Sequence, residues 1–177
     1  MEFLGELHPP IVHFAIALVI VSVFFDFFGL ILKKDSLKNA GFWTLVVGAI
    51  AVIGAFITGH QAEELVEKAI EGSEAYKRLE IHETVGNFVL GLVLLLTAFR
   101  VFISKKSDIR LMGIYLLVGF IVISVVGLQG RIGGKLVYEF GVGVKPVMTE
   151  QLNKSNNNGD VDKEEDKHYK QEEKEED

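Results

Sequence analysis

The chain has 177 residues, of which 49% are hydrophobic and none is cysteine. The absence of cysteine excludes disulfides, cysteine-held iron–sulfur clusters, c-type haem and cysteine nucleophiles. The net charge is −6, and residues 150–177 account for all of it, because acidic and basic residues balance in the rest of the chain. Basic patches with interleaved aromatic residues are missing, so the composition argues against a nucleic-acid partner.

Four apolar segments follow one another along the chain, at about 11–32, 40–59, 84–103 and 109–128. Each reaches the ~20 residues that a helix needs to cross ~30 Å of hydrocarbon. The connections after the first and third segments are short, which forces antiparallel neighbours. The sequence therefore predicts an all-α polytopic membrane protein. Residues 1–148 would form an antiparallel four-helix transmembrane bundle in the lipid bilayer, and residues 149–177 an acidic, disordered tail.

Basic residues gather in the two short connections: Lys33, Lys34 and Lys38 in the first, and Lys105, Lys106 and Arg110 in the second. The ten residues before the first segment contain no lysine or arginine. Since lysine and arginine favour the cytoplasmic side in short loops, this pattern predicts that both termini are extracytoplasmic.

Two other stretches lie on the extracytoplasmic side in this topology. Residues 61–80 are rich in Glu, Ala, Leu and Lys, with apolar residues in a helical rhythm, which predicts a short amphipathic helix over the mouth of the bundle. Residues 130–148 contain five glycines and predict a glycine-rich loop or cap.

Histidines collect at this same end of the predicted bundle. Pro9 and Pro10 suit the first turn of a helix, which places His8 just outside the first helix and His13 one turn inside it. His60 ends the second apolar segment, and His82 precedes the third. An ionisable side chain at the edge of the hydrocarbon layer is a functional candidate, so the clustering predicts a site.

One chemistry that fits is ligation of haem b by two histidines inside a helical bundle. The first and third helices of an up-down bundle are diagonal partners, so His13 and His82 are the predicted axial ligands. His8 and His60 are candidates for a second haem or a propionate, and Arg131 is a further propionate candidate. This interpretation predicts a cytochrome-like electron-transfer module.

The second chemistry is a transition-metal site without haem. His60 with Glu63 or Glu64, and His82 with Glu83, offer imidazole and carboxylate ligands within one turn. Together with His13 they would suit zinc, copper or iron. The sequence has no His-Glu-x-x-His motif, no nucleophile triad and no phosphate loop, so it gives no support for soluble-enzyme chemistry. A structural membrane module without a cofactor is the third interpretation.

Asp26 lies within the first apolar segment. An unpaired carboxylate would be costly there, so we expect a structural ion pair with Lys33, Arg100 or Arg110.

The chain resembles a bacterial membrane family known as domain of unknown function 2231. The resemblance covers about residues 7–145 and rests on these motifs: Leu7-His8-Pro9-x-x-Val12-His13-Phe14-x-Ile16-Ala17 followed by Asp26, Thr58-Gly59-x-x-Ala62-Glu63-Glu64, His82-Glu83-x-x-Gly86, and Gly133-Gly134-x-Leu136-Val137-Tyr138. It implies a four-helix domain of the bacterial inner membrane. Some relatives look fused to Rieske-type iron–sulfur domains, which implies a redox partner of that kind and favours haem. By position, the residues that match the family pattern are His8, His13, His82 and Glu83.

Overall fold

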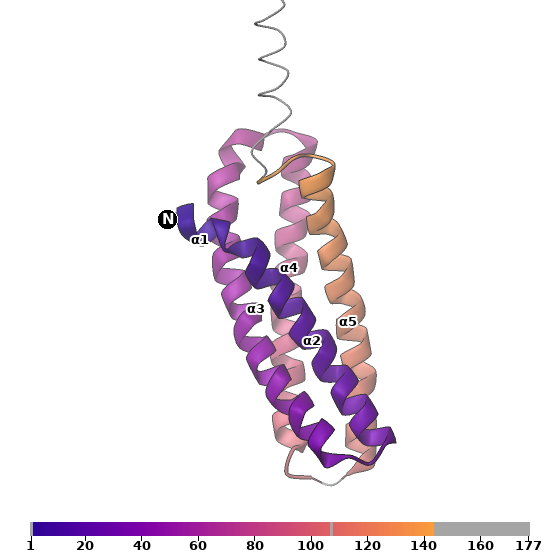
Figure 1. The fold of residues 1–177 in the computed structure, drawn as a ribbon. Helices are drawn as coiled ribbons and strands as arrows, with labels where there is room; N and C mark the ends of the chain where they lie inside the picture. Colours follow the sequence, from indigo (N-terminus) through magenta and orange to yellow (C-terminus); the bar gives the residue numbers. More distant parts are fainter. Residues whose placement is uncertain (1, 107, 144–177) are drawn as a thin grey trace, which may run out of the picture. The chain divides into compact units, whose positions relative to one another are not determined.

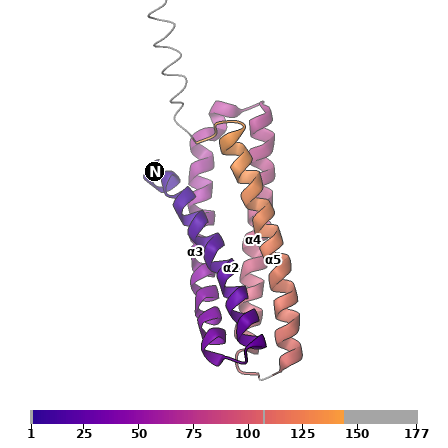
Figure 2. The ribbon, with the colours of Figure 1, turned by 45° about the vertical axis from the view of Figure 1, so that its right-hand side comes forward.

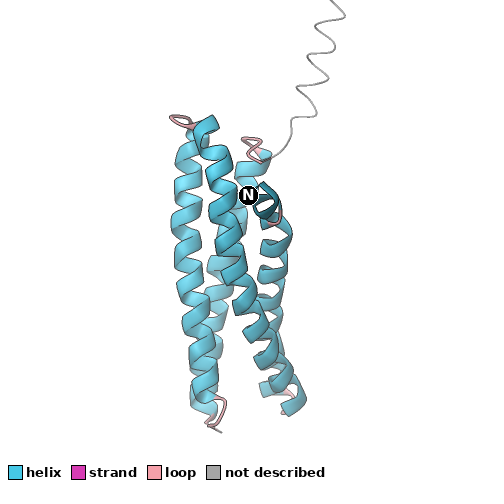
Figure 3. Cartoon of the chain, turned by 90° about the vertical axis from the view of Figure 1, so that its left-hand side faces the viewer, coloured by secondary structure: helices cyan, strands magenta, loops and turns pink. Residues whose placement is uncertain are grey.

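The computed structural model describes residues 2–106 and 108–143, which form five helices. They are α1 (Glu2–Glu6), α2 (His8–Ile31), α3 (Asp35–Ile70), α4 (Glu74–Ile103) and α5 (Ile109–Tyr138) (Figure 1). Each predicted apolar segment lies essentially within one long helix, and the described residues include no strand (Figure 3). The all-α fold class is therefore confirmed. The predicted tail at 149–177, and the part of the predicted 130–148 loop beyond Gly143, lie outside the described residues.

The four long helices form an up-down bundle. α2 packs along α3, α3 against α4, α4 along α5, and α5 against α2 (Figures 1 and 2). Consequently α2 and α4 are diagonal partners, as the short connections predict. The α2–α3 and α4–α5 turns share one end of the bundle, and the histidines lie toward the other, which we call the histidine end.

The apolar side chains are divided between the bundle core and the outside. Val19, Leu45 and Val93 are fully buried in the core, whereas Trp43 and Leu95 are among many large exposed apolar residues. Only 28–33% of the apolar window in each long helix is buried inside the bundle. Four helices that are long, apolar and lipophilic on their outer faces are what a bilayer requires.

The structure corrects the predicted helix over the mouth at 61–80. α3 continues without a break to Ile70, and after the turn at 71–73 the chain returns as α4, so the two helices extend together beyond the start of α2 (Figure 1). Gly72 adopts a left-handed conformation with φ of 75°. Ser73 then caps α4, its hydroxyl accepting a hydrogen bond from the Tyr76 backbone N–H at 3.2 Å. A glycine that ends one helix and a serine that begins the next explain the hairpin.

The predicted glycine-rich loop is also corrected, because α5 continues to Tyr138. Gly130, Gly133 and Gly134 are helical, and between residues 130 and 143 the backbone is left-handed only at Gly141 and Gly143. Small residues inside a membrane-protein helix let other groups approach its backbone closely. Gly133 shows this role, because it packs against an imidazole.

At the end opposite the histidines, Asp26 pairs with Arg100, one of its three expected partners. Both side chains are buried, with exposed fractions of 0% and 6% for the two residues. The pair joins α2 to its diagonal partner α4 and therefore fixes the arrangement of the bundle on which the histidine end depends.

Candidate functional site

Three side chains converge on the hairpin formed by α3 and α4. His60 and Glu63 lie one turn apart on α3, and Glu83 comes from the facing part of α4. One nitrogen or oxygen atom from each of the three lies within 4.8 Å of the other two. We call His60, Glu63 and Glu83 the rim cluster. Its imidazole and two carboxylates form a ligand set that first-row transition metals use in proteins.

The two carboxylates of the rim cluster differ in their surroundings. The Glu63 side chain is only 18% exposed, whereas Glu83 is an exposed residue. Nδ1 of His60 lies 3.8 Å from a Glu63 carboxylate oxygen. The carboxylates of Glu63 and Glu83 have oxygen atoms within 4.8 Å of each other. Because carboxylates this close repel each other when both are charged, a cation bound between them would remove that repulsion.

Glu64, expected as a ligand, lies on the other side of the His60 ring. One of its oxygens is 3.8 Å from Nε2 of His60, and its side chain is 54% exposed. It does not join the three-residue rim cluster. Glu63, which the sequence left as the alternative to Glu64, takes the position facing Glu83.

The structure does not bring His13 to His82. The His13 side chain is exposed, and its Nδ1 lies 2.6 Å from the Pro9 carbonyl oxygen, one turn earlier on α2. The expected arrangement, with His13 facing His82 across the core, is therefore not found. The reason is the rotation of α2 about its axis, which turns His8 rather than His13 toward the inside.

His8 and His82, which we call the interior pair, instead lie toward the inside of the bundle. Both are half-buried, and each ring packs against a glycine of a neighbouring helix, His8 against Gly59 and His82 against Gly133. Nδ1 of His8 lies 3.2 Å from the Thr58 hydroxyl oxygen. His82 is approached by Gln129 of α5, whose amide nitrogen lies 2.8 Å from the His82 carbonyl oxygen.

Neither Thr58 nor Gln129 was expected at the site from the sequence. A signal existed for Gln129, because it is a lone amide at the end of a long apolar segment, where a polar side chain needs a partner. Gly59 and Gly133 belong to the motifs that the chain shares with the family, but the sequence alone indicated no role at the site for either of them. The structure shows that each packs directly against one ring of the interior pair.

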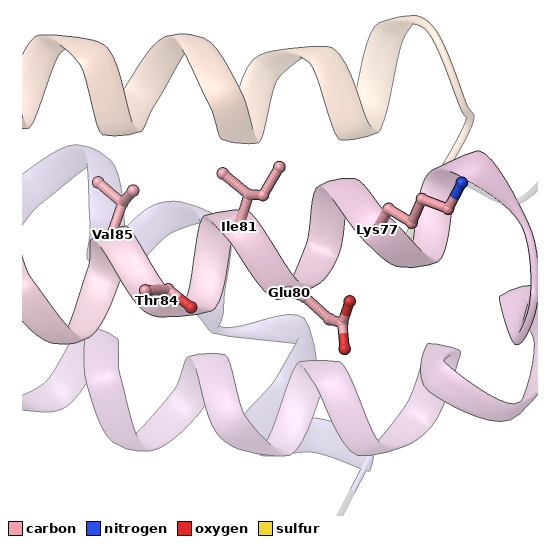
Figure 4. A pocket seen from close by; sticks show the side chains of 5 residues that line it. All are labelled: Lys77, Glu80, Ile81, Thr84 and Val85. Atoms are coloured by element: carbon pink, nitrogen blue, oxygen red, sulfur yellow. The ribbon is translucent and has the colours of Figure 1, made fainter.

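Arg131, the expected propionate ligand, is exposed on α5, and within the described part of the chain no carboxylate pairs with it. A pocket of about 350 Å³ opens on α4 and is lined by Lys77, Glu80, Ile81, Thr84 and Val85. In Figure 4, Ile81 and Val85 point to one side of α4 and Glu80 to the other. No residue of the rim cluster or of the interior pair lines this pocket.

The model of a family described as "Predicted membrane protein (DUF2231)" matches residues 5–146, which include the rim cluster and the interior pair. No curated protein and no solved structure matches the chain.

Proposed function

Because this chain belongs to the DUF2231 family of predicted membrane proteins, we propose that it is a four-span membrane protein that binds a divalent transition-metal ion at its rim cluster. His60 supplies one imidazole nitrogen, and Glu63 and Glu83 supply one carboxylate oxygen each. This set suits Mn²⁺, Fe²⁺ or Zn²⁺, and water would complete the coordination.

One observation carries this proposal: three donor atoms from two different helices lie within 4.8 Å of one another. Ligands on a common ion at about 2.1 Å are separated from each other by about 3.0–3.5 Å. Rotation of the side chains of His60 and Glu83, which are the two exposed members of the cluster, can supply the remaining approach.

The proposal is tested by titrating the detergent-purified, metal-stripped protein with Zn²⁺ and with Mn²⁺ in a calorimeter. We expect one ion to bind per chain, and we expect Glu63→Gln and Glu83→Gln to weaken binding by more than the ~10–100-fold cost of losing an outer-shell partner. Glu64→Gln is the matched control and should have a smaller effect. Equal losses for Glu63→Gln and Glu64→Gln, or an affinity that none of these changes alters, would refute the rim cluster as the site.

The charges flanking the helices support an extracytoplasmic histidine end, as expected for a bacterial inner-membrane protein. A metal ion would then enter from outside the cytoplasm. The chain has no cysteine, so single-cysteine variants give a clean test. A membrane-impermeant maleimide should label Ser73→Cys, in the α3–α4 turn, in intact cells. It should label Ser104→Cys, at the end of α4, only after lysis. The opposite pattern would reverse the topology.

Haem b-dependent electron transfer is the second candidate function. The observation that favours it is the interior pair, because His8 and His82 are half-buried imidazoles on diagonal helices. It would require a redox partner, for which a Rieske-type protein is the expectation. The test is a dithionite-reduced minus oxidised absorbance spectrum of protein expressed with a haem supply. Resolved α and β bands are expected if this function holds, and a flat spectrum from folded protein would rule it out.

A further inference from the structure

The α2–α3 and α4–α5 turns, which share the end of the bundle opposite the histidines (Figure 1), are rich in cations. The two carboxylates of these turns are already engaged. Asp35 pairs with Lys38 at 2.9 Å, and Asp108 accepts a hydrogen bond from the backbone N–H of Arg110 at 2.8 Å. In the described part of the chain, five exposed cations of this end have no carboxylate within ion-pair distance. We call them the basic end: Lys33, Lys34, Lys105, Lys106 and Arg110.

The other end of the helices has the opposite charge. Residues 60–83, which include the α3–α4 hairpin, carry seven glutamates but only three lysines and arginines. Because like charges repel and opposite charges attract, an anionic partner is repelled from the hairpin and attracted to the basic end. The charge distribution along the bundle therefore indicates both the sign of a partner and the end at which it binds.

The cations of the basic end lie next to apolar side chains that face outward. Leu32 directly precedes Lys33, and Ile109 directly precedes Arg110; both apolar residues are more than half exposed. Nζ of Lys106 lies 4.0 Å from the centroid of the exposed Phe102 ring. Lysine and arginine at the end of a lipid-facing helix place their charges at the level of the phospholipid headgroups. The anionic group found at that level is a lipid phosphate.

We infer that the basic end is a docking surface for anionic phospholipids, whose headgroup phosphates pair with its lysines and with Arg110. Lysine binds a phosphate as a point charge, whereas arginine can bind two of its oxygens. The acyl chains then lie along the exposed apolar faces of the helices. The inference rests neither on the rim cluster nor on which side of the membrane the basic end faces, because it concerns the lipid leaflet at that end alone.

The only tryptophan of the chain, Trp43, is placed to report on this surface. It belongs to α3, nine residues after Lys34 and thus within about three helical turns of it. Trp43 is more than half exposed, so its indole faces the lipid of the same leaflet. Bromine atoms on an acyl chain quench tryptophan fluorescence at short range. Quenching of Trp43 therefore measures which lipid lies against this end of the bundle.

The experiment reconstitutes the full chain into vesicles of phosphatidylglycerol and phosphatidylcholine, with bromine on the acyl chains of either the first or the second lipid. We expect phosphatidylglycerol to be preferred by about fivefold or more, the contribution of one lysine or arginine close to a charged surface. High salt should reduce the preference of the unaltered protein, because it screens exposed charges. Lys33→Gln combined with Lys34→Gln should weaken the preference, and replacement of all five cations by glutamine should abolish it.

Lys68→Gln combined with Arg131→Gln is the matched control. It also removes two exposed cations that have no ion pair within the described residues, but at the histidine end, and it should leave the preference unchanged. Circular dichroism and a monodisperse elution profile check that the variants fold. Equal quenching by the two lipids overturns the proposal and would leave an acidic protein surface as the partner of the basic end. A preference that salt and the lysine substitutions do not alter, or that the control lowers equally, also overturns it.

Discussion

Arg100 grips Asp26 with two parallel hydrogen bonds, since its Nε and Nη2 atoms each lie 2.8 Å from a different carboxylate oxygen. Nη2 also donates to the Lys38 carbonyl at 3.0 Å. The guanidinium carbon lies 5.5 Å from the centroid of the Phe42 ring and 5.7 Å from that of Tyr115. A single side chain of α4 thereby contacts α2, α3 and α5. These contacts hold the four long helices together at the end of the bundle opposite the histidines.

Removal of one partner of this pair should be strongly destabilising. Asp26→Ala leaves a buried guanidinium without its counter-ion, and we expect it to lower the free energy of unfolding by about 3–5 kcal/mol. Unfolding in detergent, followed by circular dichroism, measures the effect. The double variant Asp26→Ala with Arg100→Met should recover much of the loss, because it leaves no buried charge.

The control for this prediction is the Lys77–Glu74 ion pair, which is equally short at 2.8 Å but exposed. Lys77→Ala should leave the unfolding midpoint nearly unchanged, because water screens exposed pairs. An Asp26→Ala protein as stable as the original would contradict the role given to the buried pair.

Gly41 should not tolerate alanine. A Cβ atom there would lie 2.9 Å from the Asp26 carboxylate and 2.9 Å from the Ser22 carbonyl. We expect Gly41→Ala to cost about 1–3 kcal/mol of unfolding free energy, as overpacking of a close contact does. Gly113→Ala is the matched control, since nothing lies within 4 Å of a Cβ at that helical position. It should be neutral or stabilising by up to about 1 kcal/mol. Equal effects at the two glycines would show that the approach to Asp26 is not tight.

The number, order and pairing of the spans could be predicted because they depend on composition and loop length. The rotation of each helix is harder to predict. α2 is apolar on most sides, so no hydrophobic stripe identifies the face that turns inward. His8 and His13 are five residues apart and therefore point roughly 140° away from each other. The signal that could have distinguished them is Asp26, which needs a buried partner and lies about five full turns after His8, on the same face of the helix.

The same limit applies to the acidic residues. Glu63 and Glu64 are both within reach of His60 along α3, and the position of α4 alone determines that Glu63 faces Glu83. The α3–α4 hairpin, by contrast, could have been predicted from Gly72 and Ser73, because a helix-ending glycine is followed there by a capping residue.

Loss of the Ser73 cap should loosen the hairpin that carries the rim cluster. Ser73→Ala removes the acceptor for the Tyr76 N–H and should cost about 1 kcal/mol, the usual value for a helix cap. Hydrogen–deuterium exchange should then be faster in the first turn of α4 and unchanged in the Arg100 region. Ser73→Thr keeps the hydroxyl and should preserve the slow exchange. A uniform increase along all helices would indicate a global rather than a local effect.

Gly133 and Gly134 are adjacent on α5 but should respond differently to the same added methyl group. At Gly133 the new Cβ would lie 2.8 Å from Cε1 of His82, whereas nothing lies within 4 Å of a Cβ at Gly134. Gly133→Ala must therefore displace the His82 ring. We expect it to shift the ¹⁵N imidazole resonances of His82, while Gly134→Ala leaves them in place. Unchanged His82 resonances in Gly133→Ala would mean that the ring does not pack on α5.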